Sequence, residues 1–138
     1  MIVSSTITVQ SKGFTDVLDI TGSVQQIVAQ SGIRDGSAIV FVKGSTAGVS
    51  TIEFEPGLVA DLKQAFERIA PSNVPYQHDR RWGDGNGFSH IRATLMGPSL
   101  SVPLVGGVLA LGTWQQIVLV DFDNRPRRRE ILVQVTGE

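Results

Sequence analysis

Short runs of β-branched and aromatic residues cover most of this chain, and they limit its fold more than any other feature. Runs of this kind, bounded by Gly, Pro, Asn or Asp, are typical of β-strands. The runs predict strands over residues 2–10, 14–20, 37–43, 49–55, 89–95, 100–105, 108–111, 113–122 and 128–136. Because most of them follow one another without a helix between, we expect mostly antiparallel pairing and no parallel βαβ units.

Two other stretches have apolar residues at helical spacing. The first predicts a helix over 22–31 that ends at Gly32. Thr21 or Ser23 opens this helix, and Ser23 and Gln26 form a capping-box pattern. The second stretch predicts a helix over 58–70. This order of elements is that of an α+β protein, with a β-sandwich-type core of about eight strands and the two helices packed outside.

The composition limits the classes of function. The length of 138 residues suits one domain, which we place at residues 1–138. The absence of cysteine excludes disulfides, thiolate nucleophiles and Cys-ligated zinc. A net charge of −1 gives no field that would attract nucleic acid or an anionic membrane. The chain starts without the features of a signal peptide and lacks an apolar stretch of roughly 18 residues, so we expect a cytoplasmic protein without nucleic-acid or membrane partners.

Residues 71–88 form a long stretch rich in Pro, Gly, Asn and Asp, and a loop of this length is usually functional. It contains His78 and Asp84 and leads into His90. Imidazole and carboxylate groups bind metals and transfer protons, so this spacing suggests a shared metal or catalytic site. The alternative is a pair of loop histidines that bond only to backbone carbonyls.

Polar side chains on two predicted strands extend this candidate site. The strand predicted over 89–95 would place His90, Arg92 and Thr94 on one face. Glu53, in an earlier predicted strand, is either a solvated residue or a carboxylate that faces the site as a base or metal ligand.

Three further features could bind a substrate. Residues 44–48 (GSTAG) include Ser45 and Thr46, which either cradle a phosphate or form a tight β-turn. Trp114 could pack in a core, contact another subunit or stack on a planar ring. Arginines cluster near the last turn, and Arg127 and Arg129 among them offer either a solvated face or contacts to an anion.

Four blocks of residues, in this order, resemble the YjbQ family over essentially the whole chain. The blocks are the Gly44-Ser45-Thr46-Ala47 turn through Glu53, the series Tyr76, His78, Asp84, Asn86 and His90, the run Leu111-Gly112-Thr113-Trp114-Gln115, and the turn Pro126, Arg127 and Arg129. The resemblance implies a homotrimer and an activity as a secondary thiamine-phosphate synthase. That reaction joins a pyrimidine diphosphate to a thiazole phosphate and releases pyrophosphate.

The resemblance also adds two candidate residues, and the chain departs from the family pattern at one position. It adds Asn86 and Gln115 to the substrate-binding positions. Many family members have His before the Ser-Thr-Ala triplet, where this chain has Gly44.

Three functions follow as hypotheses. The first is an enzyme in which His78, Asp84 and His90 hold a divalent ion such as zinc or magnesium, and a small phosphorylated molecule is bound. Its substrate contacts are Ser45, Thr46, Asn86, Trp114, Gln115, Arg127 and Arg129. The second is a non-catalytic trimer that binds a metal or a phosphorylated metabolite. The third is a metal-dependent hydrolase with Glu53 as base.

Overall fold

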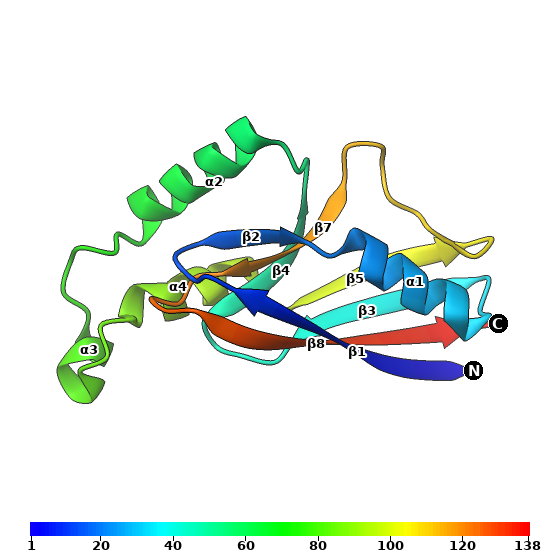
Figure 1. Cartoon of the computed structure of the whole chain (residues 1–138), viewed down its shortest axis with the longest axis horizontal. Helices are drawn as coiled ribbons and strands as arrows, with labels where there is room; N and C mark the ends of the chain where they lie inside the picture. The colour runs from blue at the N-terminus through cyan, green and yellow to red at the C-terminus, as the bar shows by residue number, and fades with distance from the viewer.

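Two antiparallel sheets and four helices make up the computed structural model, which describes residues 1–138 (Figure 1). The strands are β1 (Ile2–Ser11), β2 (Asp16–Asp19), β3 (Gly36–Val42), β4 (Ala47–Ile52), β5 (Ser99–Val105), β6 (Val108–Leu109), β7 (Gln116–Asp121) and β8 (Arg127–Gly137). The helices are α1 (Thr21–Ser31), α2 (Pro56–Ile69), α3 (Gln77–Trp82) and α4 (Gly87–Met96). The α+β class and the antiparallel pairing are confirmed, whereas the prediction of two helices is wrong because there are four.

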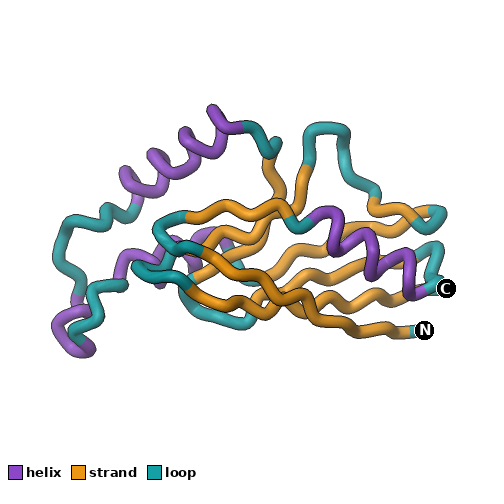
Figure 2. The backbone as a smooth tube through the Cα atoms, viewed as in Figure 1, coloured by secondary structure: helices purple, strands orange, loops and turns teal.

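The larger sheet has the strand order β1-β8-β3-β5-β6, and the smaller sheet has the order β2-β7-β4. Both termini lie at one end of the molecule, and α3 lies at the other (Figure 1). The tube view shows that loops gather around α3 and α4 at that far end (Figure 2). The strands therefore bring several loops together at the end opposite the termini.

The strand β7 is buried on both faces, which explains its unbroken apolar run. Leu119 packs in the core between the two sheets. Val118 and Val120 point the other way and pack with Phe66 of α2 and Ala93 of α4. The smaller sheet is thus a middle layer, with the larger sheet on one side and α2 and α4 on the other.

The predicted helix over 22–31 is present as α1, with the first of its two predicted starting residues. The helix begins at Thr21, and the carboxylate of Asp19 accepts hydrogen bonds from the Thr21 backbone N–H (2.9 Å) and hydroxyl (2.7 Å). The capping box predicted at Ser23 is therefore wrong, because the first turn has already formed before that residue. Gly32 ends the helix in the left-handed conformation, with φ of 72°, as predicted.

The helix predicted over 58–70 is present as α2, and an unexpected residue caps it. The Glu55 side chain accepts hydrogen bonds from the backbone N–H groups of Gly57 and Leu58, both at 2.8 Å. These bonds lower the pKa of Glu55. None of the four helices is long and apolar enough to cross a membrane.

The prediction of a strand over 89–95 is wrong, because these residues lie within α4. The helix buries Phe88, Ser89, Arg92 and Ala93, at helical spacing. A serine and an arginine occupy two of these positions, so hydrophobicity alone does not show the helical period. His90 and Arg92 therefore do not share a strand face as predicted.

The boundaries of one loop and of two strands also differ between the prediction and the structure. The loop predicted over 71–88 contains the short helix α3 and the first two residues of α4. The run predicted over 108–111 pairs only at its first two residues, and the run over 113–122 starts at Gln116 because residues 113–115 form part of a turn.

Candidate functional site

A polar cavity of about 370 Å³ opens where loops from both sheets meet α3 and α4. Its walls come from the β3–β4 loop, α3, the α3–α4 segment, α4 and the start of β8. The lining residues are Gly44, Ser45, Thr46, His78, Trp82, Asp84, Asn86, His90, Arg127 and Arg129. The fold thus gathers eight of the predicted site residues from these five parts of the chain.

The two histidines of the chain lie side by side in this cavity. The ring centroids of His78 on α3 and His90 on α4 are 4.4 Å apart, with a tilt of 41° between the planes. Burial lowers the pKa of His90, and the neighbouring His78 lowers it further. His90 is therefore neutral at pH 7 and offers a free nitrogen lone pair, the form that binds a metal or accepts a proton.

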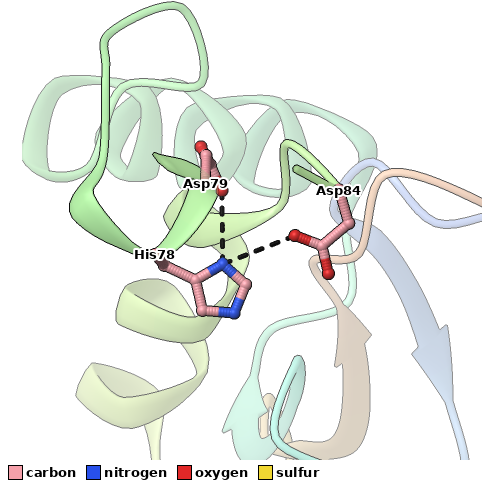
Figure 3. Close-up of side chains that lie close together, drawn as sticks. All are labelled: His78, Asp79 and Asp84. Carbon is pink, nitrogen blue, oxygen red and sulfur yellow. Dashed lines mark hydrogen bonds and ion pairs between the residues drawn. The ribbon is translucent and has the colours of Figure 1, made fainter. Parts of the chain in front are cut away.

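Two carboxylates face one nitrogen of His78 (Figure 3). The Nδ1 atom lies 3.3 Å from Oδ1 of Asp79 and 3.5 Å from Oδ1 of Asp84. A carboxylate accepts hydrogen bonds, so it favours the tautomer with the proton on Nδ1 and leaves Nε2 as the metal-binding atom. Ligand atoms of these three residues lie within 4.8 Å of one another.

Asp79 connects α3 to α4. Its Oδ1 atom also accepts a hydrogen bond from the backbone N–H of Gly87 (2.8 Å), at the start of α4. Gly87 packs tightly at this junction, since a Cβ added there would lie 2.7 Å from Cβ of Tyr76. The same carboxylate therefore orients His78 and fixes the helix that carries His90.

A buried network of ion pairs forms the floor of the cavity. Arg129 donates to Asp121 from Nε (2.7 Å) and Nη2 (2.8 Å). Arg127 donates from Nε to Oδ2 of Asp123 (2.8 Å), and its Nη2 lies 2.7 Å from the same oxygen. The Thr46 hydroxyl joins the two pairs, because it accepts from Nη2 of Arg129 (2.6 Å) and donates to Asp123 (3.0 Å). Both carboxylates are fully buried, so the arginines are held in place.

Asn86 connects this network to the histidine side. Its Nδ2 donates to Oδ1 of Asp123 (3.2 Å), whereas its own Oδ1 is buried and has no hydrogen-bond partner. Burial alone would raise the pKa of Asp123, but the hydrogen bonds that it accepts outweigh burial and lower the pKa. An unpaired buried oxygen beside a cavity suits a water, a ligand donor or a cation.

The structure separates the other three predicted site residues from this cavity. Glu53 and Trp114 line a second cavity of about 450 Å³, and the Trp114 side chain is 72% exposed. Gln115 donates from Nε2 to the Thr51 hydroxyl (3.3 Å) and accepts from the Gly112 backbone N–H (2.9 Å). Within one subunit, Glu53 therefore does not line the cavity of the histidines.

Residues 5–138 match the family described as UPF0047 protein YjbQ-like. A UPF0047 protein from Archaeoglobus fulgidus is 37% identical over 128 residues, which is 93% of this chain and 97% of that protein. This chain belongs to the YjbQ-like UPF0047 family. Another UPF0047 relative, from Mycobacterium tuberculosis, is 39% identical over 132 residues, 89% of this chain and 98% of that protein.

Two solved structures have the same fold. A YbjQ-like protein of unknown function from Sulfolobus solfataricus superposes with a TM-score of 0.95 at 33% identity and covers 100% of this chain and 99% of its own. A hypothetical protein from Aeropyrum pernix gives a TM-score of 0.91 at 33% identity, covering 99% of each chain.

Sequence reasoning missed the acidic members of this YjbQ-like site. Asp121 and Asp123 alternate at the end of a buried strand, and Arg127 and Arg129 alternate just beyond the turn. Two acidic residues at alternate positions before the turn and two arginines at alternate positions after it could have predicted the buried ion pairs. Asp79 follows His78 directly, and nothing local distinguishes it from an exposed helix residue.

Proposed function

We propose that this chain is a small-molecule enzyme whose polar cavity binds a divalent cation and a phosphorylated substrate side by side. The observation that carries the proposal is the joint presence of the paired His78 and His90 rings and the Arg127 and Arg129 guanidinium groups in one cavity. Imidazoles are ligands for cations, and guanidinium groups bind phosphates.

The donor atoms on the histidine side fit a borderline cation such as zinc. His78 and His90 supply imidazole nitrogens, and Asp84 supplies a carboxylate. Asp79 orients His78 through Nδ1. The unpaired Oδ1 of Asn86 offers a further oxygen nearby. Magnesium is the alternative if substrate phosphates complete its coordination. When bound, such a cation would neutralise charge on a phosphate leaving group.

Other residues of the same cavity supply hydrogen-bond donors for a phosphate. The Nη1 atoms of Arg127 and Arg129 donate to no group of the chain, and the exposed Ser45 lines the same cavity. Thr46 positions Arg129, because its hydroxyl is already bonded to the network. These residues bind and orient the substrate rather than react with it.

The candidate reaction is that of a thiamine-phosphate synthase, with this chain as a homotrimer. In that reaction the bond from a pyrimidine methylene carbon to the diphosphate breaks, and the carbon forms a bond to the thiazole nitrogen. Arg127 and Arg129 would hold the diphosphate, which leaves with the electrons of the broken bond, and no proton is transferred because the thiazole nitrogen becomes a quaternary cation. Trp114 and Gln115, in the second region, could contribute only from another subunit or at a separate step.

Metal reconstitution tests the cation half of the proposal. We expect the purified protein to retain zinc after dialysis, and the variants His78→Ala and His90→Ala to lose most of it, because each removes an imidazole ligand. Elemental analysis measures the metal content, and Asp61→Ala, an exposed carboxylate on α2, serves as the control. Equal metal content in all four proteins would contradict a shared site.

Complementation tests the reaction. In a strain that lacks its thiamine-phosphate synthase, we expect this chain to support slow growth at most, because Gly44 stands where many family members have His. Growth equal to that with a dedicated synthase would show that this His is dispensable. Phosphate binding without any rescue would favour the non-catalytic trimer.

A further inference from the structure

Arg129 has one guanidinium nitrogen that the protein does not use. Its Nε and Nη2 atoms are committed to Asp121, and Nη2 also donates to Thr46 at 2.6 Å. No group of the chain accepts a hydrogen bond from Nη1, although only 7% of Arg129 is exposed. Nη1 is therefore a free guanidinium donor at the wall of a polar cavity, where a ligand oxygen can accept from it.

Gly44 determines whether this donor can be reached. A Cβ built on Gly44 would lie 2.7 Å from Nη1 of Arg129 and 3.7 Å from its Cζ. Contacts below 3.0 Å are essentially never made by real Cβ atoms, so one of the two groups would have to move. Arg129 cannot move freely, because the fully buried Asp121 holds two of its three terminal nitrogens.

Arg127, two residues before Arg129, also has one guanidinium nitrogen that donates to no group of the chain. Arg127 uses Nε and Nη2 to bind Asp123, which leaves Nη1 free, and its side chain is one-third exposed. Alternate residues on a strand lie about 6–7 Å apart on the same face. A tetrahedral phosphate with several oxygens can bridge two such separated donors, whereas a carboxylate is better suited to one guanidinium fork.

The charges around Arg127 and Arg129 also affect which anion can bind. Asp121 and Asp123 balance the two guanidinium charges on the buried side. The free Nη1 groups therefore attract a ligand by directed hydrogen bonds and not by a strong net positive charge. Such hydrogen bonds select ligands by their geometry.

We propose that Gly44 is a specificity-determining residue: because it has no side chain, a phosphate group of the ligand can reach Nη1 of Arg129 and bridge it to Arg127. This inference rests on the proposed function, since it assumes a phosphorylated ligand in this cavity. The inference adds that the size of residue 44 controls the affinity for phosphate, although glycine has no side chain to contact the ligand.

Calorimetric titration of the full chain with inorganic phosphate tests the inference. We expect Gly44→Ala to weaken phosphate binding about tenfold or more, the effect expected from losing a charged hydrogen bond. The control is Gly22→Ala on α1, where an added Cβ meets nothing within 4 Å, and it should bind phosphate like the wild type. Metal uptake should be equal in all three proteins, because neither substitution removes an imidazole or a carboxylate.

The outcomes separate the two proposals. Wild-type affinity for phosphate in Gly44→Ala overturns the role of Gly44 and leaves the cation–phosphate cavity standing. A wild type that takes up metal but binds no phosphate overturns both the inference and the phosphate half of the proposed function. Should Gly44→Ala fail to fold, nitrogen NMR of the wild-type arginine side chains decides, since phosphate must shift the Nη1 resonance of Arg129 and an unchanged resonance refutes the contact.

Discussion

Asn86 lies where the buried ion-pair network meets the cavity. Its amide nitrogen must face Asp123, because a carboxylate only accepts hydrogen bonds, and this leaves the amide oxygen unpaired. The Asn86 amide thus stabilises the buried Asp123 carboxylate with its nitrogen and offers its oxygen as a hydrogen-bond acceptor to a ligand. Neither aspartate nor an apolar residue can do both.

Asn86→Asp should destabilise the protein strongly at neutral pH. It would place a second buried carboxylate against Asp123, whose lowered pKa keeps it ionised. We expect a loss of about 3 kcal/mol or more, the scale of an uncompensated buried charge. Thermal unfolding measures the loss, with the exposed Asn73→Asp as the control that stays within about 0.5 kcal/mol of wild type. Equal melting temperatures for the two variants would contradict this account.

The helices α2 and α4 are joined by one buried arginine. Arg92 on α4 donates to the backbone carbonyl of Ala70 (3.0 Å) and to the Thr15 hydroxyl (3.0 Å), and its Nη2 lies 2.8 Å from Glu67 of α2. The hydrogen bond from Arg92, followed by that from Ser72, lowers the pKa of Glu67 to about 2. The element that carries His90 is thus held in place on the side away from the cavity.

Glu67→Gln should lower stability at pH 7 and have less effect in acid. Since the folded-state pKa of about 2 is below the ordinary value of 4.5, the ion pair contributes above about pH 4.5 and is lost as the pH falls towards 2. Glu67 is half exposed, so we expect a difference of about 1 kcal/mol or less. Melting curves between pH 7 and pH 2 should show the wild type and variant converging.

Glu130→Gln is the matched control for this prediction. Glu130 is similarly exposed, but its two cationic neighbours, Lys43 and Arg128, lie at 3.9 and 3.6 Å. We expect this variant to follow the wild type across the range. A Glu67→Gln difference that stayed constant from pH 7 to pH 2 would show that the ion pair is not its source.

At the scale of the whole molecule, several large apolar side chains remain exposed. On α4 the side chains of Ile91 and Leu95 are one turn apart and both exposed, and Trp114 protrudes from the turn before β7. Exposed apolar groups of this kind are typical of surfaces that other chains cover. The homotrimer that the family resemblance implies would give such side chains a surface to pack against.

We therefore predict that light scattering at micromolar concentration gives three times 14.8 kDa. Leu95→Glu should reduce the measured mass if α4 contributes to the contact, because it would bury a charge. Lys12→Glu, on an exposed turn, is the control and should leave the mass unchanged. A wild-type mass of one chain would refute the trimer.

Some properties of this protein follow from local patterns in its sequence. Alternating β-branched runs identified most strands, apolar spacing with Gly32 identified α1, and four ordered blocks identified the YjbQ family. These properties are readable because the period of a strand or helix, and the glycine at a helix end, depend mainly on neighbouring residues.

Other properties depended on contacts between distant residues. The residues over 89–95 form a helix because Ser89 and Arg92 are buried by partners elsewhere in the chain, which no local pattern of hydrophobicity reveals. Likewise, only the packing of two sheets brings Arg129 against Gly44 and moves Glu53 to a different cavity. The sequence by itself determined the fold class and the family, whereas the tertiary structure decided which polar groups meet, because burial and hydrogen bonding of charges are set by distant parts of the chain.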